Sequence, residues 1–168
     1  MAGFAVTRNN PSCATPIPLR LKGQYQTIPT LHKQWSLTVD IMQLGRVSGW
    51  TNVLHFGLGC YENQTPGIWH SSLSTTVRIK GAINGDLNNL FNGPALRMDT
   101  WTRVEITQFR QIDGSYQYTI IIGGKIYYQV TNNYPEEFSN VKVYTSGNYS
   151  PAANTKITNP IIWTSMLH

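Results

Sequence analysis

Apolar and polar residues alternate with a period of two along much of the chain. The clearest example is the segment 35–42, in which every second residue is apolar up to position 41. Successive side chains on a β-strand point to opposite faces, so this alternation predicts a strand with one buried face. Its apolar members are Trp35, Leu37, Val39 and Ile41. The segment 54–58 repeats the pattern with Leu54, Phe56 and Leu58, which leaves Val53, His55 and Gly57 on the other side. No window of twelve residues has the 3.6-residue apolar spacing of an amphipathic helix.

Short turn-forming pairs separate the strand-like segments. Asn84-Gly85, Asp113-Gly114 and Gly123-Gly124 each lie between two such segments. Asn, Asp and Gly tolerate the positive φ angles that a type I′ hairpin turn requires. The last two pairs define a three-stranded meander, and two further strands are expected after it. The meander is predicted to cover 101–109, 116–122 and 125–130, and the later strands 141–145 and 156–163.

Ten or more short strands joined by Gly, Asn and Pro turns predict an all-β protein. A two-sheet antiparallel sandwich is the main interpretation, and a closed barrel is the alternative. The length of 168 residues fits one domain. Residues 1–34 are rich in proline, which is tolerated at sheet edges, so we expect an entry segment with edge strands near 4–8 and 19–22. Residues 35–168 are then expected to form the sandwich proper.

Charge narrows the range of partners. Only 12% of the residues are charged, and the net charge is +5. No Lys/Arg cluster has the density of a nucleic-acid site, so we expect no nucleic-acid binding. No apolar run approaches the roughly 18 residues that span a bilayer, so no membrane span is expected. The excess of cations is either a mildly basic surface or an attraction to an acidic glycan or an anionic cell surface. Arg78 and Lys80, two apart on one expected strand face, would suit a carboxylate, sulfate or phosphate group.

Catalytic and metal-binding patterns are absent from the sequence. There is no nucleophile elbow, zinc-peptidase helix or phosphate-binding loop. A sandwich glycosidase needs two carboxylates on one strand face. Glu105 is the only acid in its expected strand. We expect this carboxylate to pair with Arg103 or with a cross-strand base. The four histidines are scattered, and Glu62 and Asp86 are too few for a calcium site built mainly from carboxylates. We therefore expect no enzyme activity and no cofactor, with calcium left open through carbonyl and amide oxygens.

Sugar recognition needs flat aromatic faces together with fixed polar groups, and both occur in segments that we predict to be loops. These segments surround Trp50, cover 61–70, and cover 84–93. The candidate aromatic ligands are Trp50, Tyr61, Trp69 and His70. The candidate polar ligands are Arg78, Asn84, Asp86, Asn88 and Asn89. Core packing is the alternative role for the aromatic residues, and plain turn formation is the alternative for the asparagines.

Two cysteines and two glycosylation sequons bear on where the protein is found. Cys13 and Cys60 are either bridged or free, and both readings stay open. Asn63 and Asn148 begin sequons that matter only in a secreted protein. The first residues lack the pattern of a secretory signal, so the protein is either intracellular or a mature secreted domain without its leader.

Seven short motifs, taken in order, resemble those of laminin-G/concanavalin A-like jelly-roll modules of secreted and cell-surface animal proteins, including invertebrate lectin-like ones. They are Gly49–Phe56 (GWTNVLHF), Pro66–His70 (PGIWH), Ala82–Gly85 (AING), Pro94–Leu96 (PAL), Trp101–Ile106 (WTRVEI), Phe138–Tyr144 (FSNVKVY) and Pro151–Ile157 (PAANTKI). The resemblance covers about 35–163. It implies a jelly-roll topology, a secreted protein, and recognition of glycans or of proteins.

This chain departs from such modules at two places. They often carry acidic residues where this chain has Asn63, Gln64 and Thr65, which argues against a calcium site in that loop. They also often carry a cysteine pair flanking the Ile-Asn-Gly turn, at the positions that Lys80 and Leu90 occupy here. The turn would then be held by hairpin hydrogen bonds alone.

Together these observations favour a non-enzymatic, lectin-like carbohydrate-binding module of an extracellular animal protein. Its partners would be glycans or glycoproteins, and a homo-oligomer would strengthen weak single sites. The alternative is a protein–protein interaction or adhesion module that binds through a sheet face or edge. A third hypothesis is a degenerate glycanase relative whose residual hydrolysis would depend on Glu105.

Overall fold

The computed structural model describes residues 4–6, 17–18, 24–57, 64–145 and 153–166. Within these ranges the chain forms thirteen β-strands and no helix, which confirms the all-β class. Cys13, Cys60, Tyr61, Asn63 and Asn148 lie outside the described residues, so the predictions made for them stay predictions. None of the described segments is a helix of the length and hydrophobicity needed to cross a membrane.

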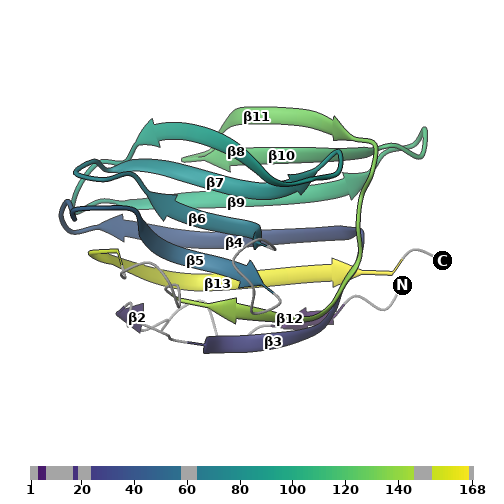
Figure 1. Cartoon of the computed structure of the whole chain (residues 1–168), viewed down its shortest axis with the longest axis horizontal. Helices are drawn as coiled ribbons and strands as arrows, with labels where there is room; N and C mark the ends of the chain where they lie inside the picture. The colour runs from purple at the N-terminus through teal and green to yellow at the C-terminus, as the bar shows by residue number, and fades with distance from the viewer. Residues whose placement is uncertain (1–3, 7–16, 19–23, 58–63, 146–152, 167–168) are drawn as a thin grey trace.

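The strands form two antiparallel sheets stacked as two layers (Figure 1). Sheet A contains, in spatial order, β1 (Phe4–Val6), β13 (Thr155–Ser165), β4 (Gln34–Gln43), β9 (Trp101–Arg110), β10 (Tyr116–Ile122) and β11 (Lys125–Asn132), and β2 (Ile17–Pro18) also pairs with β13. Sheet B contains β3 (Gln24–Leu31), β12 (Phe138–Tyr144), β5 (Thr51–Gly57), β6 (Gln64–His70), β7 (Thr76–Ile83) and β8 (Asp86–Ala95). The two open sheets make a jelly-roll sandwich, as expected, and the barrel alternative is wrong.

The core lies between the two sheets and follows the period-two pattern. The alternating apolar residues of β4, β5 and β7 are at most 4% exposed. Trp35 meets Tyr118 edge to face, with 6.0 Å between ring centroids. Burying each large apolar side chain contributes about 1.5–3 kcal/mol, so this continuous layer is the main stabilising feature of the fold.

The turn predictions are confirmed in two of three cases. Asn84 and Gly85 have φ angles of 53° and 80°, and Gly123 and Gly124 have 59° and 79°, as a type I′ turn requires. The third connection is longer, because residues 111–115 separate β9 from β10. There only Gly114 has a positive φ, and the Asp113 carboxylate accepts hydrogen bonds from the Ser115 amide and hydroxyl at 2.9 and 2.7 Å.

Three strands were missed or assigned as loops from the sequence. The segments 61–70 and 84–93 were expected to be loops, but they contain β6 and most of β8. Pro66 and Gly67 in β6 resemble a turn signal, and β8 is an edge strand that is rich in asparagine. The third is β3, an edge strand of sheet B that carries Pro29. The expected edge strand near 19–22 lies outside the described residues.

Candidate functional site

Three of the nine predicted ligand-binding residues, Trp50, Trp69 and Arg78, meet on the face of sheet B that points away from sheet A. We call it the outer face. On β7 the side chains alternate, so that Val77 and Ile79 are buried while Arg78 and Lys80 point outward. This confirms the shared face predicted for the two cations. Arg78 lies opposite Trp69 of β6 and Asn92 of β8, and Lys80 lies opposite Leu90.

A β-bulge in β5 brings two polar residues onto the outer face. The pairing of β5 with β6 shifts between Asn52 and Leu54, so Val53 is fully buried. The bulge therefore places Asn52 and His55 on the same side, and the Asn52 Oδ1 atom lies 3.2 Å from His55 Nδ1. The sequence pattern had instead placed Val53 beside His55. Asn52 lies opposite Trp69, and His55 lies opposite Gly67.

The six-membered ring of the Trp69 indole lies directly against Gly67. A Cβ atom at Gly67 would be 2.0 Å from the ring of Trp69, so only glycine leaves room for it. His55 stacks between Trp69 and Tyr144, at centroid distances of 6.2 and 4.9 Å. The ammonium of Lys80 lies 5.5 Å from the centre of the Trp69 ring. Trp69 is only 5% exposed, so it supports its neighbours and offers no open face to a ligand.

Arg78 and Trp50 form the exposed part of this surface. The Arg78 guanidinium carbon lies 4.1 Å from the centre of the Trp50 ring, a cation–π arrangement. Trp50 is 42% exposed and ends the 44–50 connection. That connection is fixed by a hydrogen bond from the Gly49 amide to Ser72 Oγ at 2.9 Å, with Gly49 at a φ of 81°. One face of the indole thus holds the guanidinium in place.

The outer face has unused hydrogen-bonding capacity. The described ion pairs are His32–Glu137 and Arg103–Asp40, so neither Arg78 nor Lys80 pairs with a carboxylate in the described part of the chain. The Nδ2 atom of Asn52 and the Nε atom of Arg78 are buried and have no hydrogen-bond partner there. Buried donors without partners are costly. The surface is therefore suited to a ligand that supplies acceptor oxygens and negative charge.

The other predicted site residues are dispersed. Asp86 and Asn88 are exposed on β8, where the Asp86 carboxylate accepts the Asn88 amide hydrogen at 2.8 Å. Asn89 lies opposite Gly81, on the inward side of the same strand. Trp69 and His70 were expected to be loop aromatics, but both lie in β6, and His70 is 1% exposed in the core. Asn52, His55 and Gly67 were not singled out, because only the cross-strand register brings them together.

Asn84 holds two sheets together. Its backbone amide donates to Asn132 Oδ1 at 2.8 Å, its Nδ2 atom donates to the Thr131 carbonyl at 3.2 Å, and its Oδ1 atom accepts from the Asn133 amide at 2.6 Å. These bonds join the β7–β8 turn of sheet B to the end of β11 in sheet A. The side chain is thus committed to the fold, in the turn role that was the alternative for this asparagine.

Burial also affects the two histidines of this region. It lowers the pKa of His55 and of His70 to about 4, from the usual 6.5. The unfolded chain therefore binds more protons than the folded chain between pH 6.5 and 4, and stability should fall as the pH falls through this window. For His70 alone the slope should approach about 1.4 kcal/mol per pH unit.

Urea unfolding at several pH values between 7.5 and 4.5 tests this expectation. The wild type should lose stability below pH 6.5, and H70Q should show a shallower slope, with H55Q as a second variant on the outer face. A wild-type stability that stays constant down to pH 4.5 would contradict it.

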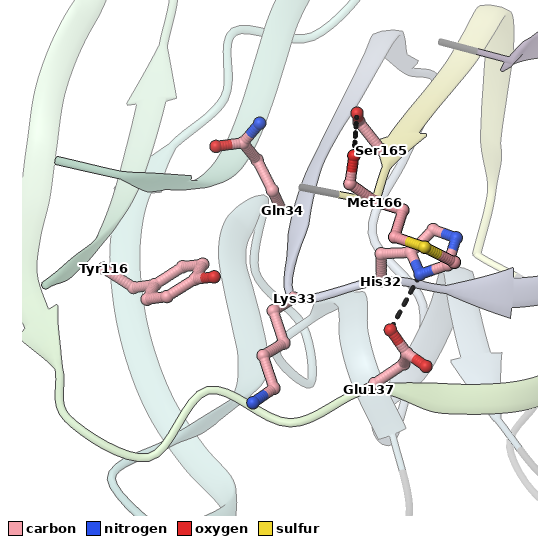
Figure 2. A pocket seen from close by; sticks show the side chains of 7 residues that line it. All are labelled: His32, Lys33, Gln34, Tyr116, Glu137, Ser165 and Met166. Atoms are coloured by element: carbon pink, nitrogen blue, oxygen red, sulfur yellow. Dashed lines mark hydrogen bonds and ion pairs between the residues drawn. The ribbon is translucent and has the colours of Figure 1, made fainter. Parts of the chain in front are cut away.

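The β3–β4 and β11–β12 connections lie at the other end of the sandwich from the start of β5 (Figure 1). A separate cavity lies beside these two connections (Figure 2). It has a volume of about 170 Å³ and is lined by His32, Lys33, Gln34, Tyr116, Glu137, Ser165 and Met166. His32 Nδ1 lies 2.7 Å from the Glu137 carboxylate. This pair connects the β3–β4 connection with the β11–β12 connection, both of which cross between the sheets. The two side chains contact each other across these connections, so the evident role of the pair is to close this end.

The described residues give little support for catalysis by carboxylates or for metal binding. No group of three or more His, Cys, Asp or Glu side chains there is arranged to hold a metal ion. Arg103 donates to both carboxylate oxygens of Asp40, at 2.9 and 3.1 Å, so its hydrogen-bond partner is Asp40, while Glu105 acts on it only electrostatically. Glu105 lies opposite Thr38 and Ile121 on the outside of sheet A, away from the outer face of sheet B.

Known proteins resemble this chain in structure but not in sequence. No family model and no curated protein matches the chain. Among solved structures, the heptameric SAP-like pentraxin of Limulus polyphemus superimposes with a TM-score of 0.61 at 11% identity, over 91% of this chain and 77% of the pentraxin. The Trypanosoma rangeli sialidase in complex with sialic acid gives 0.57 at 12% identity, over 80% of this chain and 21% of the enzyme.

A third similar structure comes from botulinum neurotoxin type C, described as entering cells through interaction with two ganglioside molecules. It gives a TM-score of 0.53 at 13% identity, over 80% of this chain and 33% of the toxin chain. Identities this low establish shared architecture only. The chain is thus a jelly-roll module with the concanavalin A-like lectin fold. It corresponds to a fifth of the sialidase chain and a third of the toxin chain.

Proposed function

We propose that the protein is a non-enzymatic, lectin-like carbohydrate-binding module that recognises acidic glycans on the outer face of sheet B. The observation that carries the proposal is Arg78. Its guanidinium is held on the Trp50 ring and faces no carboxylate among the described residues. An arginine fixed in this way is ready to bind a carboxylate or sulfate with two parallel hydrogen bonds.

The neighbouring groups fit a sugar ring. The exposed face of Trp50 can cover the apolar C–H side of a pyranose, and Asn92, directly opposite Arg78, is exposed and offers an amide to the hydroxyls. Lys80 adds a second positive charge two residues along the same strand. The combination of an aromatic face, an amide and two cations without a carboxylate partner among the described residues supports an acidic sugar over a neutral one.

The similar structures are consistent with this proposal. The sialidase is described with sialic acid, which carries a carboxylate, and the toxin with gangliosides. The sialidase match covers only a fifth of that enzyme. On β4, the strand paired with the strand of Glu105, the carboxylate of Asp40 is hydrogen-bonded to Arg103. We therefore propose binding without hydrolysis. An extracellular location and a homo-oligomer, which would add avidity, belong to the same proposal.

Replacing Arg78 tests the site. R78A should weaken binding of an acidic glycan by roughly 10- to 100-fold, because it removes a charge-assisted hydrogen-bonded contact and exposes Trp50. Isothermal titration with a sialylated or sulfated oligosaccharide measures the change. R110A removes an exposed arginine at the last position of β9, in the other sheet, and is the matched control, which should bind normally. Equal affinities of R78A and wild type for the same glycan would contradict the proposed site.

A further inference from the structure

One end of the sandwich is formed by several connections held together by backbone hydrogen bonds. The connections 44–50, 71–75 and 96–100 meet there, beside the start of β13 (left in Figure 1). The Leu73 amide donates to the Val47 carbonyl at 2.9 Å, Leu96 donates to Thr75 at 2.9 Å, and Leu44 donates to Asn154 at 2.9 Å. We call this the loop end. These bonds hold its exposed side chains on one fixed surface.

Charge is distributed unequally between the two ends. The loop end carries the exposed cations Arg46, Arg97 and Lys156, with Lys125 at the adjacent β10–β11 turn, and its one exposed acid in the described residues is Asp99. The opposite end carries the exposed acids Asp86, Asp113, Glu136 and Glu137, with Lys33 and Arg110 as its exposed Lys/Arg residues in the described ranges. An anionic surface therefore attracts the loop end and repels the other.

Large apolar side chains project from the same loop end. Leu73 is 65% exposed, Met98 is 46% exposed and Trp101 is 40% exposed. Each lies within or directly after one of the connections that form this end. Exposed apolar residues beside cations are typical of surfaces that bind the interface of a lipid bilayer.

Leu73 has a backbone conformation and an exposure that are both unfavourable for leucine. Its φ angle is 52°, in the left-handed region that suits glycine or asparagine and costs a bulky side chain energy. It is also largely in water, so it gains little from burial. Neither the backbone conformation nor burial in the core favours a leucine at this position. A partner that receives an apolar side chain would explain it.

We propose that the loop end docks on an anionic lipid bilayer. Leu73, Met98 and Trp101 would enter the region between headgroups and acyl chains, while Arg46, Arg97 and Lys156 contact the headgroups. Exposed apolar residues occur at the opposite end too, among them Ile112, Tyr134 and Met166, but they lie beside acids. Charge therefore selects which end faces the membrane. Of the glycan site, Trp50 belongs to the 44–50 connection of the loop end, while Arg78 and Asn92 lie on strands of sheet B.

Vesicle flotation tests the proposal, with phosphatidylcholine vesicles with or without 30% phosphatidylserine and no glycolipid. The protein should float with the anionic vesicles only, and less at 0.5 M than at 0.1 M NaCl. L73N should weaken binding roughly three- to tenfold without lowering the melting temperature, because asparagine tolerates positive φ. The double variant R97Q/K156Q should lose at least about tenfold, because each cation near the surface contributes about fivefold.

Matched controls come from the opposite end. I112N changes a fully exposed apolar residue, and K33Q/R110Q removes two cations, so neither should alter flotation. Equal flotation with neutral and anionic vesicles would overturn the proposal. So would flotation with neither kind of vesicle, or equal losses in L73N and I112N. Binding to a soluble polyanion without flotation would also overturn it, since the cations would then serve another partner.

Discussion

G67A is expected to lose about 3 kcal/mol of stability and to bind no glycan that the wild type binds. An added Cβ would lie 2.0 and 2.1 Å from two ring atoms of Trp69, so the indole must leave its place on the strand. The ring contacts His55 and lies below the Lys80 ammonium, so its movement disturbs the whole outer face. Denaturant unfolding and glycan titration measure the two effects.

Two controls isolate this contact. G45A adds the same methyl group where it meets only the end of the exposed Asn154 side chain, so it should cost less than about 1 kcal/mol. In a W69A background, G67A should become nearly neutral, because the clashing ring is gone. If G67A is as destabilising with W69A as without it, the packing of the indole on Gly67 is not the reason for the glycine.

N132A is expected to cost about 3 kcal/mol, because it removes a buried group with four hydrogen bonds. The Asn132 Nδ2 atom donates to Gln108 Oε1 at 2.8 Å and to the Ala82 carbonyl at 3.2 Å. Its Oδ1 atom accepts from the amides of Asn84 at 2.8 Å and Tyr134 at 3.2 Å. These bonds join the two sheets at the end where the chain passes from β11 to β12. In N132A the four groups that bond to the Asn132 side chain would lose their partner.

Urea unfolding of N132A and N133A measures the cost of losing this network. Asn133 is the next residue, is exposed, and takes part through its backbone amide, so N133A should change stability by less than about 0.5 kcal/mol. A cost of less than about 1 kcal/mol for N132A would show that the network adds little to the joining of the sheets.

The period-two pattern predicted the strands whose two faces differ most. β4 and the β9–β10–β11 meander were found where expected, because apolar residues at alternate positions of each strand pack into the core. β8 and β6 escaped detection for opposite reasons. β8 is an edge strand rich in asparagine, and β6 is buried along most of its described length and contains a Pro-Gly pair. Local composition could not separate either from a loop.

The site was predicted in part. Trp50 and Arg78 were singled out, and the structure places them in contact at 4.1 Å. Asn52 and His55 were missed, because strict alternation cannot anticipate the bulge that puts both on one face. Asn84 was given a binding role from its residue type, while its side chain holds the end of β11. Cross-strand register and bulges are tertiary properties, and one strand read alone does not encode them.

Glycan-array binding by the wild type and R78A, in the presence of EDTA, tests the central claim most directly. The proposal predicts that the wild type binds carboxylated or sulfated glycans in preference to their neutral counterparts, and that R78A loses this preference while staying folded. If the wild type binds no glycan, or binds neutral and acidic glycans alike with R78A unchanged, the outer face of sheet B is not an acidic-glycan site. A protein partner recovered in that case would favour the adhesion alternative.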